Sequence, residues 1–266
     1  PADGDNGLRG AWTEAIAAPI RPLEQKAAAT FGYTQFGQPG KVVSDVVEPK
    51  LGIRTIRFAN GVRLNIKRTD LKADQVLIQV SVDGGEMLAT RDNPLATRMV
   101  QVLALGGLGK HSKDDLDTML AGRTVSVNFG STEETFVAIA ATTPRDLELQ
   151  LQLMTAQVVD PGYRKEGEVL FKQSINNLFA SLRATPGGAL SAELGAIMSD
   201  NDPRVSLGKV EDYRALSFDQ LKSTLAGRFA NGAIEIGIVG DVDEEATIGF
   251  VARTFGALPP REPDFR

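Results

Sequence analysis

The sequence predicts an α+β fold in which helices pack on one face of a largely antiparallel mixed sheet. Segments with the two-residue alternation of strands and segments with the helical period follow in the order strands, helices, strands, helices, and then a final strand and helix. The hydrophobic content of 42% and the charged content of 24% are ordinary for a globular protein. A chain of 266 residues can also bury a substantial core.

Residues 1–48 are predicted to connect a preceding domain to the folded body, residues 49–266. They are rich in glycine and proline and show weak periodicity, apart from one amphipathic stretch at residues 12–20. A flexible terminus without a preceding domain would have the same composition. Because the chain starts at Pro1 and carries no signal-like segment, we expect a fragment or a processed product.

A β-hairpin is predicted at the start of the body. Apolar and polar residues alternate over residues 54–58 and again over residues 62–67, and Asn60 and Gly61 lie between the two runs. Asn-Gly is the preferred central pair of a type I′ turn, which joins adjacent antiparallel strands.

A third strand and a helix are expected after this hairpin. Residues 76–82 alternate in the same way, and two glycines follow soon after them. Pro94 occupies a typical first helical position with Asn93 as the cap, so a helix is predicted over residues 94–105.

The middle of the chain is predicted to hold a short helix and a second hairpin. Ser112 and Asp115 have the spacing of a capping box, which predicts a helix through Leu120. Residues 124–129 and 135–141 are expected to form two further strands.

Residues 143–158 allow two interpretations. Leucine occupies every second position from Leu147 to Leu153, as in a strand. By contrast, Leu147, Leu151 and Val158 share one face of a helix, and both the length of the segment and its Thr-Pro start favour the helix. The remaining elements are predicted as helices at residues 165–183, 189–198 and 217–229, a buried strand at 233–239 and a helix at 244–255.

Two glycine-rich segments are weak candidates for nucleotide sites. Residues 106–110 fail as a phosphate-binding loop, because Ala104 replaces the first glycine of that motif and His111 stands where Ser or Thr would follow the lysine. A helix stop followed by a turn is the better interpretation. Residues 237–240 lead from a strand to a helix, but the third glycine and the ribose-binding acid of a dinucleotide site are missing.

The chain has one histidine, His111, and no cysteine. A conventional zinc site needs two or three nitrogen or sulfur donors and cannot form from this chain alone. His111 lies beside Asp114, Asp115 and Asp117, but acids at the start of a helix are expected as caps and as partners of the helix dipole. A Ser-His-Asp triad would also need His111, and no Gly-x-Ser-x-Gly elbow is present.

This chain is expected neither to bind nucleic acid nor to insert into a membrane. The net charge is −5 and the basic residues are dispersed, whereas nucleic-acid surfaces are basic and clustered. No apolar run is long enough to span a bilayer.

Several segments resemble, in this order, motifs of the repeating domain of the M16 (pitrilysin/insulinase-like) zinc metallopeptidases. Residues 58–64 are similar to the family's Asn-Gly-hydrophobic-Arg opening, and residues 82–85 to the glycine-bearing end of its third strand. Residues 238–243 and 255–259 are similar to the strand and helix that close one repeat. The resemblance covers residues 46–260 and implies the metallohydrolase fold that mitochondrial processing peptidase shares.

In catalytic repeats of this family, a His-x-x-Glu-His motif on the helix after the third strand supplies two zinc ligands and the general base. A downstream glutamate supplies the third ligand. The resemblance places Thr97, Val100 and Gln101 at the motif positions and Gln173 or Ser174 at the downstream position. These side chains are poor zinc ligands, so the resemblance implies no catalytic residue and no metal site in this chain.

The resemblance therefore implies a non-catalytic, peptide-enclosing repeat of a longer bacterial metalloendopeptidase. Zinc is expected in a companion domain, and the expected partners are the companion M16 domains of the same polypeptide and a peptide substrate. A non-enzymatic binding or assembly subunit of the same fold is the alternative, and an independent enzyme that uses His111 is a third. Resemblance to long bacterial members implies a periplasmic location.

Overall fold

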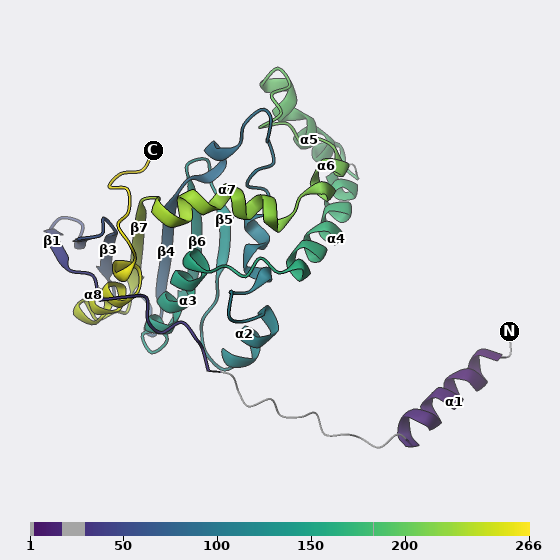
Figure 1. Cartoon of the computed structure of the whole chain (residues 1–266), viewed down its shortest axis with the longest axis horizontal. Helices are drawn as coiled ribbons and strands as arrows, with labels where there is room; N and C mark the ends of the chain where they lie inside the picture. The colour runs from purple at the N-terminus through teal and green to yellow at the C-terminus, as the bar shows by residue number, and fades with distance from the viewer. Residues whose placement is uncertain (1–2, 18–29, 183) are drawn as a thin grey trace. The chain divides into compact units, whose positions relative to one another are not determined.

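The computed structural model describes residues 3–17, 30–182 and 184–266. The chain divides into two compact units, which meet in the sequence between Thr30 and Phe31 (Figure 1). Residues 31–48, which the sequence assigned to a connector, therefore belong to the second unit. Tyr33 is buried in that unit, and the last seven residues of the segment form a strand of its sheet.

The first unit contains helix α1, Asp3–Ala17. Leu8, Trp12 and Ile16 are exposed, and their four-residue spacing places them on one side of this helix. The predicted amphipathic stretch reaches beyond α1, and its residues 18–20 lie outside the described residues.

The second unit is built on a seven-stranded sheet with the strand order β1-β2-β3-β7-β4-β6-β5 (Figure 1). β3 and β7 run parallel, and the other neighbouring strands are antiparallel. The predicted largely antiparallel mixed sheet is confirmed. The strands are β1 (Val42–Glu48), β2 (Ile53–Phe58), β3 (Arg63–Arg68), β4 (Val76–Asp83), β5 (Asn128–Ser131), β6 (Thr135–Thr142) and β7 (Ile234–Gly240).

Helices cover one face of this sheet. Figure 1 shows α3, α7 and α8 along that face, where they pack on β6, β4 and β3 respectively. The helices are α2 (Lys113–Met119), α3 (Leu147–Val159), α4 (Lys165–Leu182), α5 (Pro186–Met198), α6 (Val210–Ala215), α7 (Phe218–Asn231) and α8 (Glu244–Arg253), and the 3-10 helices are η1 (Gly85–Leu88), η2 (Val100–Gly106) and η3 (Phe255–Ala257).

The core lies between the helices and the sheet because strand side chains alternate between the two faces. In β4, Val76, Ile78 and Val80 are buried under the helices, and the residues between them point to the other face. In β7, Ile236 and Ile238 are buried in the same way. The predicted helix at residues 143–158 is also confirmed, as α3. Nine residues of α3 are buried, because this helix packs against both the sheet and the neighbouring helices.

The predicted α-helix at residues 94–105 is wrong. Residues 94–99 form turns, and a 3-10 helix follows over Val100–Gly106, with bonds such as Val100 N to Thr97 O at 3.0 Å. Three β-branched residues in this stretch lower helix propensity. Burial of Leu95 and Met99 in the core then holds the chain in the tighter turns.

The predicted type I′ turn of the first hairpin is also wrong, although the hairpin itself is confirmed as β2 and β3. Gly61 has a φ of 95°, but Asn60 is not among the described residues with a positive φ, which a type I′ turn requires. The Asn60 side chain instead donates hydrogen bonds to the carbonyl oxygens of Phe255 and Leu258, at 2.9 and 3.0 Å. Tertiary bonds to the end of the chain thus set the turn.

Candidate functional site

The positions that the resemblance assigns to a zinc motif lie around η2 and α4, which pack against each other. Thr97 is buried in a turn and Val100 is completely buried in the core. Gln101 on η2 and Gln173 on α4 are exposed. This donor set does not fit zinc, which binds imidazole, thiolate and carboxylate groups. Among the described residues, no group of three or more His, Cys, Asp or Glu side chains could hold a metal ion. The absence of a zinc site in the whole chain stays a prediction.

The glycine-rich loop at residues 106–110 turns its carbonyl oxygens toward a cation. The Arg164 guanidinium donates hydrogen bonds of 2.5 to 3.0 Å to the carbonyl oxygens of Gly106, Leu108, Gly109 and His111. A phosphate site would present amide N–H groups instead. Here the amide of Lys110 donates to the Tyr33 hydroxyl and that of Gly109 to the Asp160 carbonyl, each at 2.8 Å. The loop is a turn, as its sequence indicated.

His111 is a packed side chain whose ring accepts a structural hydrogen bond. Its Nε2 accepts from the amide of Gly32 at 2.9 Å, and its ring stacks on Phe31. Burial lowers the pKa of His111, so the acceptor form is favoured. Asp115 and Ser112 form the predicted capping box of α2. Asp115 therefore serves the start of α2, and Asp117 pairs with Lys113.

The glycine segment at residues 237–240 ends a central strand and leads into α8. Gly240 has a φ of 141°, and a Cβ atom there would clash with the carbonyl oxygen of Gln75. The side chain of Asp243 accepts a hydrogen bond from the amide of Ala246 at 2.8 Å and so caps α8. A residue of the chain itself thus occupies the N-terminus that a dinucleotide would need.

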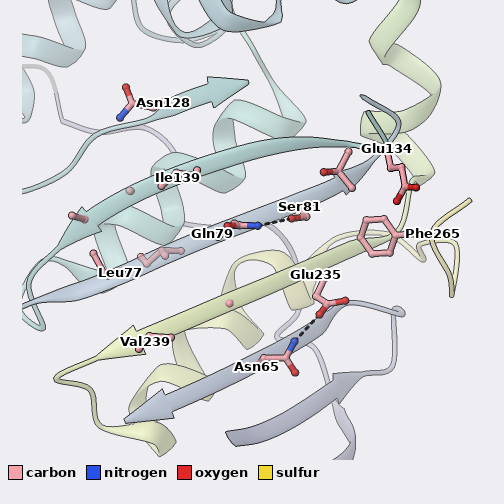
Figure 2. Close-up of a pocket in the computed structure, with 15 residues that line it drawn as sticks. Asn65, Leu77, Gln79, Ser81, Asn128, Glu134, Ile139, Glu235, Val239 and Phe265 are labelled. Carbon is pink, nitrogen blue, oxygen red and sulfur yellow. Dashed lines mark hydrogen bonds between the residues drawn. The ribbon is translucent and has the colours of Figure 1, made fainter. Parts of the chain in front are cut away.

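The sheet face opposite the helices is an open surface that the sequence reasoning missed. It forms a shallow groove of about 960 Å³ across β3, β7, β4 and β6 (Figure 2). Leu77, Ile139 and Val239 lie on it with 49%, 54% and 40% of their surfaces exposed. Register places Leu77 opposite both Val239 and Ala141, so apolar groups of three strands meet. The sequence held a signal for this face: strands with one solvated face usually carry polar residues there, and these strands carry Leu77, Ile139 and Val239 among their polar ones.

Polar side chains on this open face bond to one another. The Asn65 amide donates to Glu235 at 2.7 Å, and Gln79 donates to the Ser81 hydroxyl at 3.3 Å, as Figure 2 shows. Phe265 stands at one end of the groove, where Arg63 lies 5.5 Å from its ring centre. The polar groups of this face thus have partners, whereas the aliphatic side chains of Leu77, Ile139 and Val239 remain exposed to solvent.

Comparison with known proteins identifies the fold. No family model matches the chain. The sequence is similar to the chloroplastic stromal processing peptidases of Arabidopsis thaliana, 23% identical over 211 residues, and Pisum sativum, 21% identical over 202 residues. These matches cover 78% and 74% of this chain but 17% and 16% of those proteins, so the chain spans less than a fifth of the curated relatives.

Solved structures with the same fold are M16 peptidases and related proteases. The ferredoxin protease FusC, solved in complex with Arabidopsis ferredoxin, matches 98% of this chain and 29% of its own, with a TM-score of 0.74 and 18% identity. The periplasmic protease PqqL of Escherichia coli matches 94% and 27%, with a TM-score of 0.72 and 13% identity. An inactive peptidase M16 domain of Pseudomonas fluorescens matches 81% and 53%, with a TM-score of 0.65 and 17% identity. The predicted resemblance to an M16-like repeat is confirmed at the level of the fold.

None of the helices in the described part of the chain is both long enough and apolar enough to span a bilayer.

Proposed function

We propose that this chain, which has the fold of M16 peptidases, is a non-catalytic repeat of a longer zinc metalloendopeptidase and helps to enclose its peptide substrate. The observation that carries the proposal is the chemistry at the positions where a catalytic repeat would hold zinc. Thr97 and Val100 are buried, and Gln101 and Gln173 offer neutral amides. None of these groups can replace an imidazole ligand or a carboxylate base.

The proposal assigns zinc and the general base to a companion domain of the same polypeptide. Support comes from the curated relatives, which are much longer than this chain, and from the structural neighbour described as an inactive domain. The open face with Leu77, Ile139 and Val239 is the surface we assign to a companion domain. Likeness to PqqL, a periplasmic protease, supports a periplasmic location.

Metal analysis and peptidase assays test this proposal directly. After dialysis against zinc, we expect the purified chain to hold far less than one zinc per molecule and to cleave no peptide of a mixed library. The longer parent should cleave peptides, lose that activity on chelation, and keep it when Gln101 and Gln173 are changed to Ala. One zinc per isolated chain that is lost in Gln101→Ala or Gln173→Ala would overturn the proposal.

A non-enzymatic binding or assembly subunit is the second candidate. The open aliphatic sheet face favours it, because a subunit interface needs such a surface whether or not a peptidase is attached. The two candidates differ in the reading frame upstream of Pro1. A His-x-x-Glu-His segment encoded there supports the first candidate, and a frame without one supports the second.

A further inference from the structure

A small pocket lies between helices α2 and α3, away from the open sheet face. Its volume is about 250 Å³. Aliphatic side chains make up most of its wall, namely Leu116, Leu120, Val125, Val127 and Leu153. Lys113 and Asp117 also line it, and they pair with each other. The pocket lining is thus mostly apolar, and the opposite charges of Lys113 and Asp117 balance each other.

One face of α3 carries a row of polar side chains that holds extended backbone. Asp146 accepts a hydrogen bond from the amide of Thr124 at 2.7 Å. Four residues further on, Gln150 accepts from the amide of Ser126 at 2.9 Å and donates to the carbonyl of Ser126 at 2.7 Å. The side-chain amide of Gln150 therefore pairs with a peptide residue as a neighbouring strand would.

Gln157 continues this row seven residues after Gln150, which is about two helical turns and the same face. It lines the pocket and is 2% exposed. Among the described residues, its Nε2 is one of three buried side-chain polar atoms without a hydrogen-bond partner. A buried donor without an acceptor costs free energy, and such a group in a native structure calls for an explanation. Its terminal torsion is broad and two-fold, so either end of the amide can face the pocket.

We propose that this pocket binds a peptide in extended conformation. One uncharged aliphatic side chain would enter the pocket beside Leu116 and Leu153, and the backbone of that residue would pair with the Gln157 amide, as Ser126 pairs with Gln150. The natural ligand rests on the proposed peptide-enclosing function, but the binding itself does not. It can therefore be tested on this chain alone, and it can fail while the zinc and peptidase tests succeed.

The test is an NMR titration of the ¹⁵N-labelled chain with three capped peptides, acetyl-Ala-Leu-Ala-amide, acetyl-Ala-Gly-Ala-amide and acetyl-Ala-Asp-Ala-amide. The Gln157 side-chain signals are assigned by their loss in Gln157→Met. We expect the leucine peptide to shift them saturably, with at least tenfold tighter binding than the glycine or aspartate peptide. Val125→Phe, which fills the pocket, should abolish the shifts. Equal shifts with all three peptides, or none with any, would overturn the proposal.

Denaturation distinguishes a binding role from a structural one. Gln157→Met removes a donor without a partner, so its unfolding midpoint in urea should equal or exceed that of the wild type. Gln150→Met, the matched control, removes two hydrogen bonds to Ser126 and should lower the midpoint. If Gln157→Met lowers the midpoint as much as Gln150→Met, the Gln157 amide serves the fold, and the proposal is wrong.

Discussion

Arg228 on α7 forms an ion pair with Asp83 at the end of β4, with Nη1 and Oδ2 2.7 Å apart. The Asp83 side chain has no exposed surface. Arg266 also donates to Asp83, from its amide and its Nε, each at 2.9 Å. Arg228 extends the cluster through two hydrogen bonds to Glu262. The cluster therefore joins a helix of the covering layer, a central strand and the end of the chain.

Replacement of Asp83 by Asn should destabilise the protein strongly. Asn lacks the buried charge that accepts from Arg228 and Arg266, although Arg228 keeps its two hydrogen bonds to Glu262, so we expect a loss of about 2 kcal/mol in the free energy of unfolding. Urea denaturation measures it. Glu148→Gln is the control, because Glu148 pairs with Arg253 at a similar 2.8 Å on the surface and should cost less than about 1 kcal/mol. Equal effects of the two changes would contradict this account of the cluster.

The same cluster makes stability depend on acid pH. Burial alone would raise the pKa of Asp83, but hydrogen bonds from Arg266 and Arg228 outweigh it and hold the pKa below its ordinary value of 3.8. A carboxyl whose pKa is lower in the folded state stabilises the fold above its unfolded pKa. This contribution is lost as the pH falls from about 4 through the folded pKa. Urea denaturation between pH 6 and pH 3 should show a smaller pH dependence in Asp83→Asn than in the wild type.

His111 is a second group whose titration should affect stability, and unlike Asp83 it is charged in its protonated form. Burial lowers its pKa below 6.5, Lys110 and Arg164 act in the same direction, and Asp115 opposes them. Because the folded state then binds the proton less tightly than the unfolded state, the contribution to stability is complete above pH 6.5 and is lost as the pH falls below it. One histidine gives one set of ring signals, so NMR titration reads the pKa directly. A midpoint at or above 6.5 would show that burial does not dominate.

Much of the fold could be predicted because its signals are local. The alternation in β4 and the capping residue Ser112 each predict an element from a few neighbouring residues, and both elements formed. The helix prediction for residues 94–99 is wrong for a non-local reason, since burial of Leu95 and Met99 outweighs the helical start signal at Pro94. β1 was missed because it lies at the sheet edge, where its side chains are mostly exposed and show no clean alternation.

The candidate sites divide in the same way. The resemblance assigned Thr97, Val100 and Gln101 to the positions of a zinc motif from the order of motifs alone, and this assignment stays a prediction. The sequence could not reveal the Gln157 pocket, which depends on α2 and α3 meeting across residues 125–127. A buried glutamine without a partner is visible only when every neighbour is placed.

Tyr33 should anchor the segment that the sequence had assigned to a connector. Its hydroxyl donates to Asp160 at 2.6 Å and accepts from the amide of Lys110 at 2.8 Å. Tyr33→Phe removes both bonds inside a buried site, so we expect a loss of about 1–3 kcal/mol in the free energy of unfolding. Limited proteolysis should also cut residues 31–40 faster than in the wild type.

Tyr163→Phe is the matched control for this variant. It removes the same hydroxyl group from a tyrosine whose ring packs on Phe218 instead of on residues 31–40. Cleavage of residues 31–40 at the wild-type rate is therefore expected in Tyr163→Phe. If Tyr33→Phe is cut no faster than this control, the two hydrogen bonds of Tyr33 do not hold the segment in place.

The open sheet face should matter in the longer parent and not in the isolated chain. Leu77→Thr and Ile139→Thr keep good strand formers at exposed positions, so each should change the stability of the isolated chain by about 0.5 kcal/mol or less. In the parent, a companion domain on this face would bury both side chains, and each loss should cost about 1 kcal/mol or more. For a domain of this size that lowers the unfolding temperature by about 2–4 °C.

Leu71→Thr is the control, because Leu71 is 89% exposed and lies away from the groove. If the face variants and the control behave alike in the parent, no companion domain covers this face.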